Sequence, residues 1–176
     1  ARLNLKYKVW KNPVMKLKGI NSRVENSMVY VDAEYQMPEV FSILKLSYVI
    51  NNEGDIQVTQ KLLTEKGKKV PNMFRYGMRM RMPKEMYYSH FYGRGPVENY
   101  IDRNHNSFVG IYKMTTQEQF YPYIRPQENG CKTDIRWWNQ TNKGGIGLNF
   151  VASKPFSMVA LNYKLNLLTM VTSKIK

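Results

Sequence analysis

Residues 91–103, FYGRGPVENYIDR, carry the side chains whose types and spacing could perform chemistry. Two carboxylates, Glu98 and Asp102, lie four positions apart in this stretch. Glycoside hydrolysis uses two carboxylates that are about 5–5.5 Å apart for retention, or about 6.5–9.5 Å apart for inversion. In a strand the two side chains would share one face at roughly 13 Å, whereas a loop could bring them closer. The spacing therefore neither makes nor excludes a catalytic pair.

A structural role is the favoured interpretation of the same stretch. Gly93 and Gly95 permit positive φ angles, and Pro96 fixes the turn that follows. Each carboxylate could accept backbone N–H bonds or pair with Arg94 and Arg103. Two guanidinium groups so close lower carboxylate pKa values, which disfavours proton transfer at neutral pH. We therefore expect a wide loop held by hydrogen bonds rather than a catalytic pair.

A second polar and aromatic cluster lies at residues 121–139, YPYIRPQENGCKTDIRWWN. Aromatic rings stack on the C–H faces of sugars, and amide or carboxylate groups such as those of Glu128 and Asn129 bond sugar hydroxyls. Trp137 and Trp138 are adjacent in a predicted strand, so they should point to opposite faces. One tryptophan would then belong to the core, and only the other could meet a ligand or another domain.

The remaining reactive side chains are few. Cys131 is the single cysteine, so an internal disulfide and a multi-cysteine metal site are excluded. Two histidines, His90 and His105, are too few for a histidine-rich metal centre. We expect no catalytic residue, no metal ligand and no cofactor in this chain.

The net charge of +14 raises the question of a nucleic-acid partner. Basic residues open the chain without one acid, at Arg2, Lys6, Lys8, Lys11, Lys16 and Lys18. Arg75, Arg79 and Arg81 share one face of a predicted strand, and the other cations are scattered. No recognised nucleic-acid motif accompanies them, so they fit solvated faces or contacts with an acidic segment. The sequence has no run of about 18 apolar residues, which is the length that a membrane-spanning helix needs. We expect neither nucleic acid nor a membrane as partner. The start of the sequence lacks a secretory apolar region, and the cytoplasm and the periplasm both stay open as locations.

Period-two alternation positions these clusters on strands. Residues 42–50, SILKLSYVI, place Leu44 and Leu46 on one side and Lys45 on the other. NNEGD then supplies hairpin chemistry before the returning strand. The expected strands are residues 28–36, 42–50, 56–63, 74–82, 86–92, 107–115, 131–139, 145–153 and 156–163.

Residues 74–82, FRYGMRMRM, show the most regular alternation in the chain. The pattern predicts a strand with Tyr76, Met78 and Met80 facing inward, and with arginines facing outward. A methionine stripe at this period indicates core rather than a ligand site. Many short strands separated by Gly, Pro and Asn predict an all-β antiparallel sandwich or barrel. We expect residues 1–176 to form a single domain, and one that is incomplete.

Both clusters resemble the paired motifs of β-galactosidases in glycoside hydrolase family two. The residues that match the first motif, GxGPxENYxDR, are Gly93, Gly95, Pro96, Glu98, Asn99, Tyr100, Asp102 and Arg103. Those that match the second, which follows it by a few tens of residues, are Tyr123, Pro126, Glu128, Asn129 and Gly130. The resemblance covers most of residues 25–163.

The resemblance implies the C-terminal, small-chain domain of such an enzyme. That domain is an antiparallel supersandwich similar to galactose mutarotases, here truncated at both ends. The catalytic glutamates of the family lie in a separate barrel domain, so Glu98 and Glu128 inherit no catalytic role. The chain alone should be inactive. It would pack on the barrel of the same polypeptide and help to wall a site for β-galactoside sugars.

The resemblance and the clusters together give one set of candidate carbohydrate-binding or interface residues. They are Tyr92, Arg94, Glu98, Asn99, Asp102, Arg103, Glu128, Asn129, Trp137 and Trp138. Two alternative functions stay open. One is a stand-alone carbohydrate-binding module that uses a tryptophan with Glu128 and Asn129. The other is a mutarotase-type epimerase, which needs an acid and base pair and could draw on His90 or His105.

Overall fold

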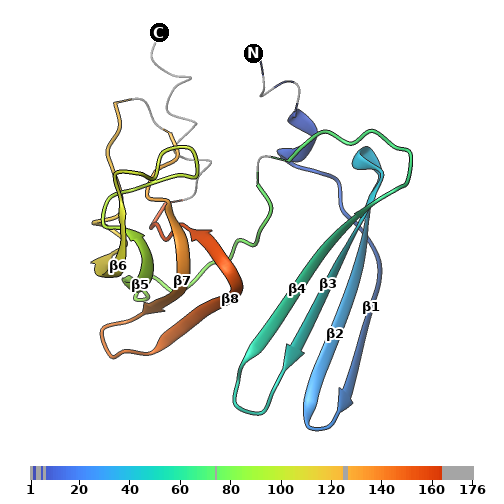
Figure 1. Ribbon diagram of the computed structural model, residues 1–176. Helices are drawn as coiled ribbons and strands as arrows, with labels where there is room; N and C mark the ends of the chain where they lie inside the picture. The colour runs from blue at the N-terminus through green and yellow to red at the C-terminus, as the bar shows by residue number, and fades with distance from the viewer. Residues whose placement is uncertain (1, 3–4, 6, 74, 125–126, 164–176) are drawn as a thin grey trace. The chain divides into compact units, whose positions relative to one another are not determined.

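The computed structural model describes residues 2, 5, 7–73, 75–124 and 127–163. Two compact units make up the chain, Ala1–Met78 and Arg79–Lys176. Each unit holds one four-stranded antiparallel sheet (Figure 1), sheet A in the first and sheet B in the second. The described part contains two short 3-10 turns, η1 (Lys8–Trp10) and η2 (Pro38–Val40). The predicted all-β, antiparallel class is confirmed, whereas a single domain over residues 1–176 stays a prediction.

Sheet A is a meander in which the strands lie in sequence order. The hairpin at Asn51–Asp55 has the predicted turn chemistry, because the Asn51 side chain accepts hydrogen bonds from the backbone N–H groups of Glu53 and Asp55. Gly54 takes a positive φ of 91° there. The strands are β1 (Lys16–Glu25), β2 (Met28–Met37), β3 (Ser42–Ile50) and β4 (Ile56–Thr64).

Strand β1 is absent from the predicted strands, and a β-bulge explains why. Its register against β2 shifts between Leu17 and Gly19, so that Leu17 pairs with Tyr35 and Ile20 pairs with Ala33. The bulge puts Leu17 and Ile20 on the same face although they are three positions apart. Strict alternation is therefore broken in the sequence, and the period-two pattern does not show.

The core of the first unit lies at one end of sheet A. Met37, Val40 and Leu44 are buried there. Val9, Trp10 and Val70 are among the partly buried side chains that pack against them. Figure 1 shows η1, η2 and the segment after β4 at this end, whereas the hairpin turns lie at the other end.

Sheet B has the order β6-β5-β7-β8, so β5 lies between two later strands. Its core consists of Phe91, Ile135 and Trp138, all fully buried. The Phe91 and Trp138 rings stack with centroids 4.4 Å apart, between strands β5 and β7. The strands are β5 (Tyr88–Gly95), β6 (Phe108–Thr115), β7 (Lys132–Thr141) and β8 (Gly147–Met158).

Gly93 and Gly95 are required for close packing and not for an unusual backbone. Both lie in β5 and neither has a positive φ, so the prediction that these glycines serve to permit positive φ angles is wrong. A Cβ on Gly93 would lie 3.0 Å from the Cα of Ile135. A Cβ on Gly95 would lie 2.9 Å from the ring of Tyr112. Neighbouring strands therefore contact the bare backbone of β5 directly.

The predicted strand at residues 74–82 is wrong for its described residues, 75–82, and Phe74 lies outside the described residues. Residues 75–82 belong to no strand, and Tyr76, Met78 and Met80 are about half exposed. Alternation predicts an extended chain, but a strand also needs the edge of a neighbouring strand with which its backbone can form hydrogen bonds. Within the described residues this segment pairs with no strand of sheet A or sheet B. The strand predicted at 145–153 is part of one long edge strand, β8, which continues to Met158, and residues 159–163 of the strand predicted at 156–163 belong to no strand.

Candidate functional site

The two motif segments meet at the carboxylate of Glu98. One oxygen, Oε2, accepts the backbone N–H of Gly130 at 2.8 Å. The other oxygen, Oε1, accepts the hydroxyl of Tyr123 and pairs with Arg103 at 3.4 Å. The hydrogen bond to Glu98 is the main cause that raises the pKa of Tyr123. Three donors therefore hold one carboxylate, as the structural interpretation of the loop predicts.

Asn99 fixes the first motif loop to strand β7. Its side chain is fully buried and uses all of its hydrogen-bonding capacity. The amide nitrogen donates to the carbonyl oxygens of Arg94 and Val97, each at 3.1 Å. The amide oxygen accepts the backbone N–H and the hydroxyl of Thr133. The backbone N–H of Asn99 also donates to the carbonyl of Cys131 at 2.8 Å.

Arg94 and Asp102 do not form the ion pairs that the sequence allowed. Arg94 pairs with Asp134 on β7, and it also donates to the carbonyl oxygen of Ser107 at 2.8 Å. Asp102 lies exposed on the loop. The motif therefore supplies one clamped carboxylate and one exposed carboxylate, which is not the environment of two cooperating catalytic acids.

The second motif places Asn129 and Gly130 inside the loop. Asn129 is buried, and its side-chain oxygen accepts the backbone N–H of Tyr121. Gly130 has a φ of 78°, where a side chain would be strained, and a Cβ there would lie 2.9 Å from the carbonyl oxygen of Gln119. Glu128 is partly buried beside them. These groups build the loop, and buried Asn129 presents little surface to a sugar.

The two tryptophans divide between core and surface, as predicted. Trp138 is fully buried, and its indole N–H donates to the Gln140 side chain at 2.9 Å. Trp137 is partly exposed on the other face and forms a T-shaped ring pair with His90, with ring centroids 5.0 Å apart. Only Trp137 can therefore offer ring surface to a ligand or another domain.

Trp137 belongs to a row of apolar and aromatic side chains that crosses sheet B. We call it the outward row: Ile111 on β6, Tyr92 on β5, Trp137 on β7 and Val151 on β8. The register pairs each residue with the next across neighbouring strands. The guanidinium of Arg136 lies 5.3 Å from the centre of the Tyr92 ring. The outward row gathers Tyr92 and Trp137, whereas the other eight candidate residues lie elsewhere.

Lys132 is a buried ionisable group that the sequence analysis missed. Its side chain is 1% exposed, and Nζ donates to the carbonyl oxygen of Gly130 at 3.2 Å. Burial lowers the pKa of Lys132 to about 8, although the nearby Cys131 and Glu98 groups act in the opposite direction. The strand pattern gave no signal, because Lys132 stands where the chain enters β7.

Neither histidine is among the three groups that hold the Glu98 carboxylate. Burial, and then the charge of Lys113, lower the pKa of His90. His105 is exposed on the loop before β6. In the described part of the chain, no three His, Cys, Asp or Glu side chains are grouped so as to hold a metal ion. That same part contains no helical segment with the length and hydropathy of a membrane span.

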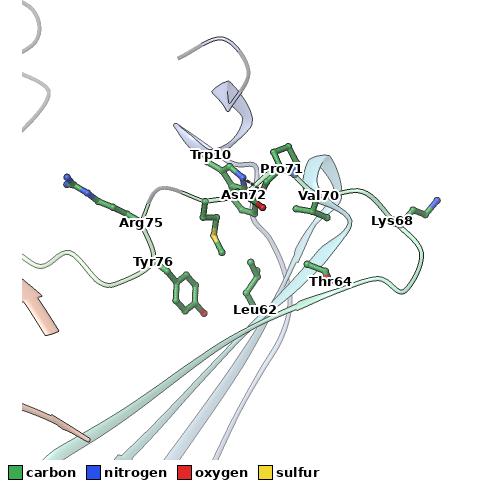
Figure 2. A pocket seen from close by; sticks show the side chains of 10 residues that line it. Trp10, Leu62, Thr64, Lys68, Val70, Pro71, Asn72, Arg75 and Tyr76 are labelled. Atoms are coloured by element: carbon green, nitrogen blue, oxygen red, sulfur yellow. Dashed lines mark hydrogen bonds between the residues drawn. The ribbon is translucent and has the colours of Figure 1, made fainter. Parts of the chain in front are cut away.

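The first unit contributes an open groove of about 690 Å³ at the covered end of sheet A (Figure 2). Trp10 forms part of its wall, and the indole N–H donates to the carbonyl oxygen of Pro71 at 2.8 Å. Leu62, Val70 and Tyr76 also line the groove. Its lining is largely apolar, and it contains none of the sequence-predicted site residues.

Comparison with known proteins assigns a family to this arrangement. The family model described as "Beta galactosidase small chain" matches residues 3–173. The chain is 28% identical over 188 residues to a β-galactosidase of Priestia megaterium, and the match covers 99% of this chain. It is 32% identical over 148 residues to a β-galactosidase of Lactobacillus delbrueckii subsp. bulgaricus, covering 82% of this chain. The chain spans only 18% and 14% of the length of these relatives.

Proposed function

Because the chain belongs to the β-galactosidase small-chain family, we propose that residues 1–176 are a non-catalytic β domain of a β-galactosidase. The complete enzyme would hydrolyse terminal β-D-galactosides with retention, through a covalent glycosyl-enzyme. The nucleophile and the acid would both lie in a barrel domain outside this chain. This domain would pack on that barrel and help to wall the sugar site.

The state of Glu98 is the observation that carries the proposal. A catalytic carboxylate must be free to exchange a proton or to attack the sugar. Glu98 is instead held by Gly130, Tyr123 and Arg103. The motif that resembles the family signature therefore supports a rigid loop rather than a reaction centre. A rigid loop is what a wall beside an active site requires.

The outward row of sheet B is the part that we propose to face the sugar site. The rings of Tyr92 and Trp137 can stack on the C–H face of a galactoside. The side chain of Asn139, next along β7 from the buried Trp138, faces the same side as Trp137 and can bond a hydroxyl. Such contacts fix the position of a sugar without taking part in bond breaking.

A chimera tests this function. In it, residues 1–176 replace the aligned region of the Priestia megaterium β-galactosidase. The parent enzyme without that region is expected to lose turnover of 2-nitrophenyl β-D-galactoside, and the chimera is expected to recover it. The pure 176-residue chain should show no turnover. A chimera that is folded by circular dichroism but inactive, or turnover by the pure chain, contradicts the proposal.

A stand-alone carbohydrate-binding function is the second candidate, and the partly exposed ring of Trp137 favours it. An NMR titration of the labelled chain with lactose would follow the indole signals of both tryptophans. Saturable shifts at Trp137 that Trp137→Ala removes, and that Tyr121→Ala leaves intact, would support binding by the chain itself. Tyr121 is a more exposed aromatic residue outside the outward row, on the loop before β7, and it is 57% exposed. Absence of any shift would leave only the wall function.

A further inference from the structure

The paired residues on one face of sheet A include no charged side chain. The register aligns its residues in four rows across the four strands. These rows, which we call the apolar face, are Leu17–Tyr35–Leu44–Leu62, Ile20–Ala33–Leu46–Gln60, Ser22–Val31–Tyr48–Val58 and Val24–Val29–Ile50–Ile56. The opposite face holds the charges, including the ion pairs Arg23–Asp32 and Lys45–Glu34. Such segregation is typical of a sheet with one buried face and one solvated face.

The first unit covers only one end of the apolar face. At that end Leu44 is 7% exposed, beneath Val9, Trp10 and Val70. At the far end Val24 is 76% exposed and Ile56 is 57% exposed. The groove of Figure 2 lies at the covered end, with Leu62 of the apolar face in its lining. An uncharged apolar surface of this extent marks a site of contact with another layer of protein.

The chemistry of the face restricts what can cover it. A charged partner surface would lose its hydration against these rows and gain no opposite charge in return. A second copy of the chain presents an equally apolar face, but each copy carries a net charge of +14, which opposes association. The Priestia megaterium relative aligns with 99% of this chain, and the chain spans only 18% of that relative. Most of such a polypeptide is therefore available as the partner.

We propose that the uncovered part of the apolar face is a docking surface. Its occupant is an uncharged apolar layer from the part of the β-galactosidase polypeptide that lies outside residues 1–176. This inference rests on the proposed function, because it takes the complete enzyme as the source of the layer. Sheets and helices pack on such a face at about 10 Å, which removes its side chains from water.

Solvent accessibility of methyl groups in the 176-residue chain is the first test. The chain carries labelled Ile and Val methyls, and a soluble paramagnetic agent is added while the molar mass is measured. We expect strong relaxation of the Ile20, Val24 and Ile56 methyls in a monomer. Weak relaxation in a monomer would mean that the chain covers the face itself. Weak relaxation in a dimer would mean that a second copy covers it. Either result overturns the proposal.

The chimera provides the second test, with two substitutions on the same strand. Ile56 lies on the apolar face, and Leu63 lies on the opposite face with a similar exposure, 49%. Ile56→Ser should leave the unfolding midpoint of the 176-residue chain unchanged and lower that of the chimera. Leu63→Ser should change neither. Equal effects of Ile56→Ser in both contexts, or equal effects of both substitutions in the chimera, overturn the proposal.

The two proposals fail in different ways. An active chimera in which Ile56→Ser has no effect keeps the proposed function and overturns the docking surface. A folded but inactive chimera that Ile56→Ser destabilises selectively supports the docking surface and contradicts the proposed function. Activity reports the sugar site, whereas the unfolding midpoint reports the apolar face.

Discussion

The side chain of Glu98 accepts the backbone N–H of Gly130 at 2.8 Å, across 32 positions of sequence. This bond joins the loop that follows β5 to the loop that precedes β7. Tyr123 donates to the same carboxylate, so the second motif contributes two of its three donors. The two motifs that resemble the family signature are therefore two halves of one hydrogen-bonded structure.

Glu98→Gln should destabilise the second unit by about 1–3 kcal/mol. The substitution removes the charge that strengthens three hydrogen bonds and turns an amide N–H₂ toward a donor. Urea unfolding followed by tryptophan fluorescence measures the loss. The exposed Asp102→Asn is the control and should stay within about 0.5 kcal/mol of the parent chain. Equal losses for both variants would show that the clamp contributes nothing to stability.

Asn99→Ala should cost more, roughly 3 kcal/mol or above, because it leaves several buried groups unsatisfied. The carbonyl oxygens of Arg94 and Val97 lose their donor, and Thr133 loses its acceptor. Asn149→Ala, on the exposed side of edge strand β8, provides a matched control. Unfolding by urea distinguishes the two, and a small effect of Asn99→Ala would argue that water replaces the lost amide.

Lys132→Met should remove a pH dependence of stability. The pKa of Lys132 is about 8 in the fold and 10.5 when the chain is unfolded. Between these values the unfolded chain binds more protons, so stability rises with pH over this window. The charged form is penalised below pH 8, so Lys132→Met should be equally or more stable at pH 7, by up to about 3 kcal/mol.

The measurement for Lys132 is the free energy of unfolding from pH 7 to 10.5 in both chains. The difference between the chains isolates Lys132 from the tyrosines that titrate in the same range. A constant difference over this range would contradict the assignment. If the unsubstituted chain instead loses stability relative to Lys132→Met as the pH rises, folding raises the pKa of Lys132 and does not lower it.

Gly93→Ala should be destabilising by roughly 2–3 kcal/mol or more, because the added methyl would meet the backbone of Ile135. Gly77→Ala is the control, since a Cβ there meets nothing within 4 Å and Gly77 has no positive φ. That change should be neutral or slightly stabilising, through the unfolded state. Thermal unfolding compares the two. Similar midpoints would show that β5 and β7 separate without cost.

Trp138→Ala should cost about 3–5 kcal/mol, whereas Trp137→Ala should cost about 1 kcal/mol or less. Trp138 is fully buried on Phe91, and Trp137 lies on the partly exposed outward row. Denaturant unfolding measures both. The reverse ranking would mean that the outward row is buried by something other than the strands of sheet B.

The fold was predictable where strands alternate without interruption. Strands β2 and β3 show Val31 opposite Tyr48 and Ala33 opposite Leu46, on the faces that the sequence pattern indicates. Strand β1 was not predictable, because the bulge between Leu17 and Gly19 breaks the period that sequence reading uses. Residues 75–82 show the converse, since they have the period but no neighbouring strand to bond. A local pattern of side chains shows which face of a strand each residue occupies. It does not show with which other segment of the chain that strand will pair.

The sequence predicted a loop held by hydrogen bonds, but it did not predict which side chains bond one another. The sequence allows each carboxylate of the first motif to accept backbone N–H bonds or to pair with an arginine, and Glu98 does both, with Gly130 and Arg103. The sequence analysis did not anticipate that Arg94 pairs with Asp134, because that contact joins two strands 40 residues apart. Lys132 was missed because it is the first residue of β7, where the strand pattern gives no sign of burial. Whether the ten candidate residues meet a sugar stays a prediction.

The strand order β6-β5-β7-β8 has a consequence for the order in which the chain is synthesised. Strands β5 and β6 can pair as soon as both have left the ribosome, since they are neighbours in sequence. Phe91 must then wait for Trp138, 47 residues later, before its ring gains a stacking partner. During that interval the Phe91 ring contacts Tyr112 of β6, with centroids 5.6 Å apart, but it lacks the Trp138 ring that stacks on it in the complete sheet. This is the stage of synthesis at which the second unit is most exposed to chaperones and to aggregation.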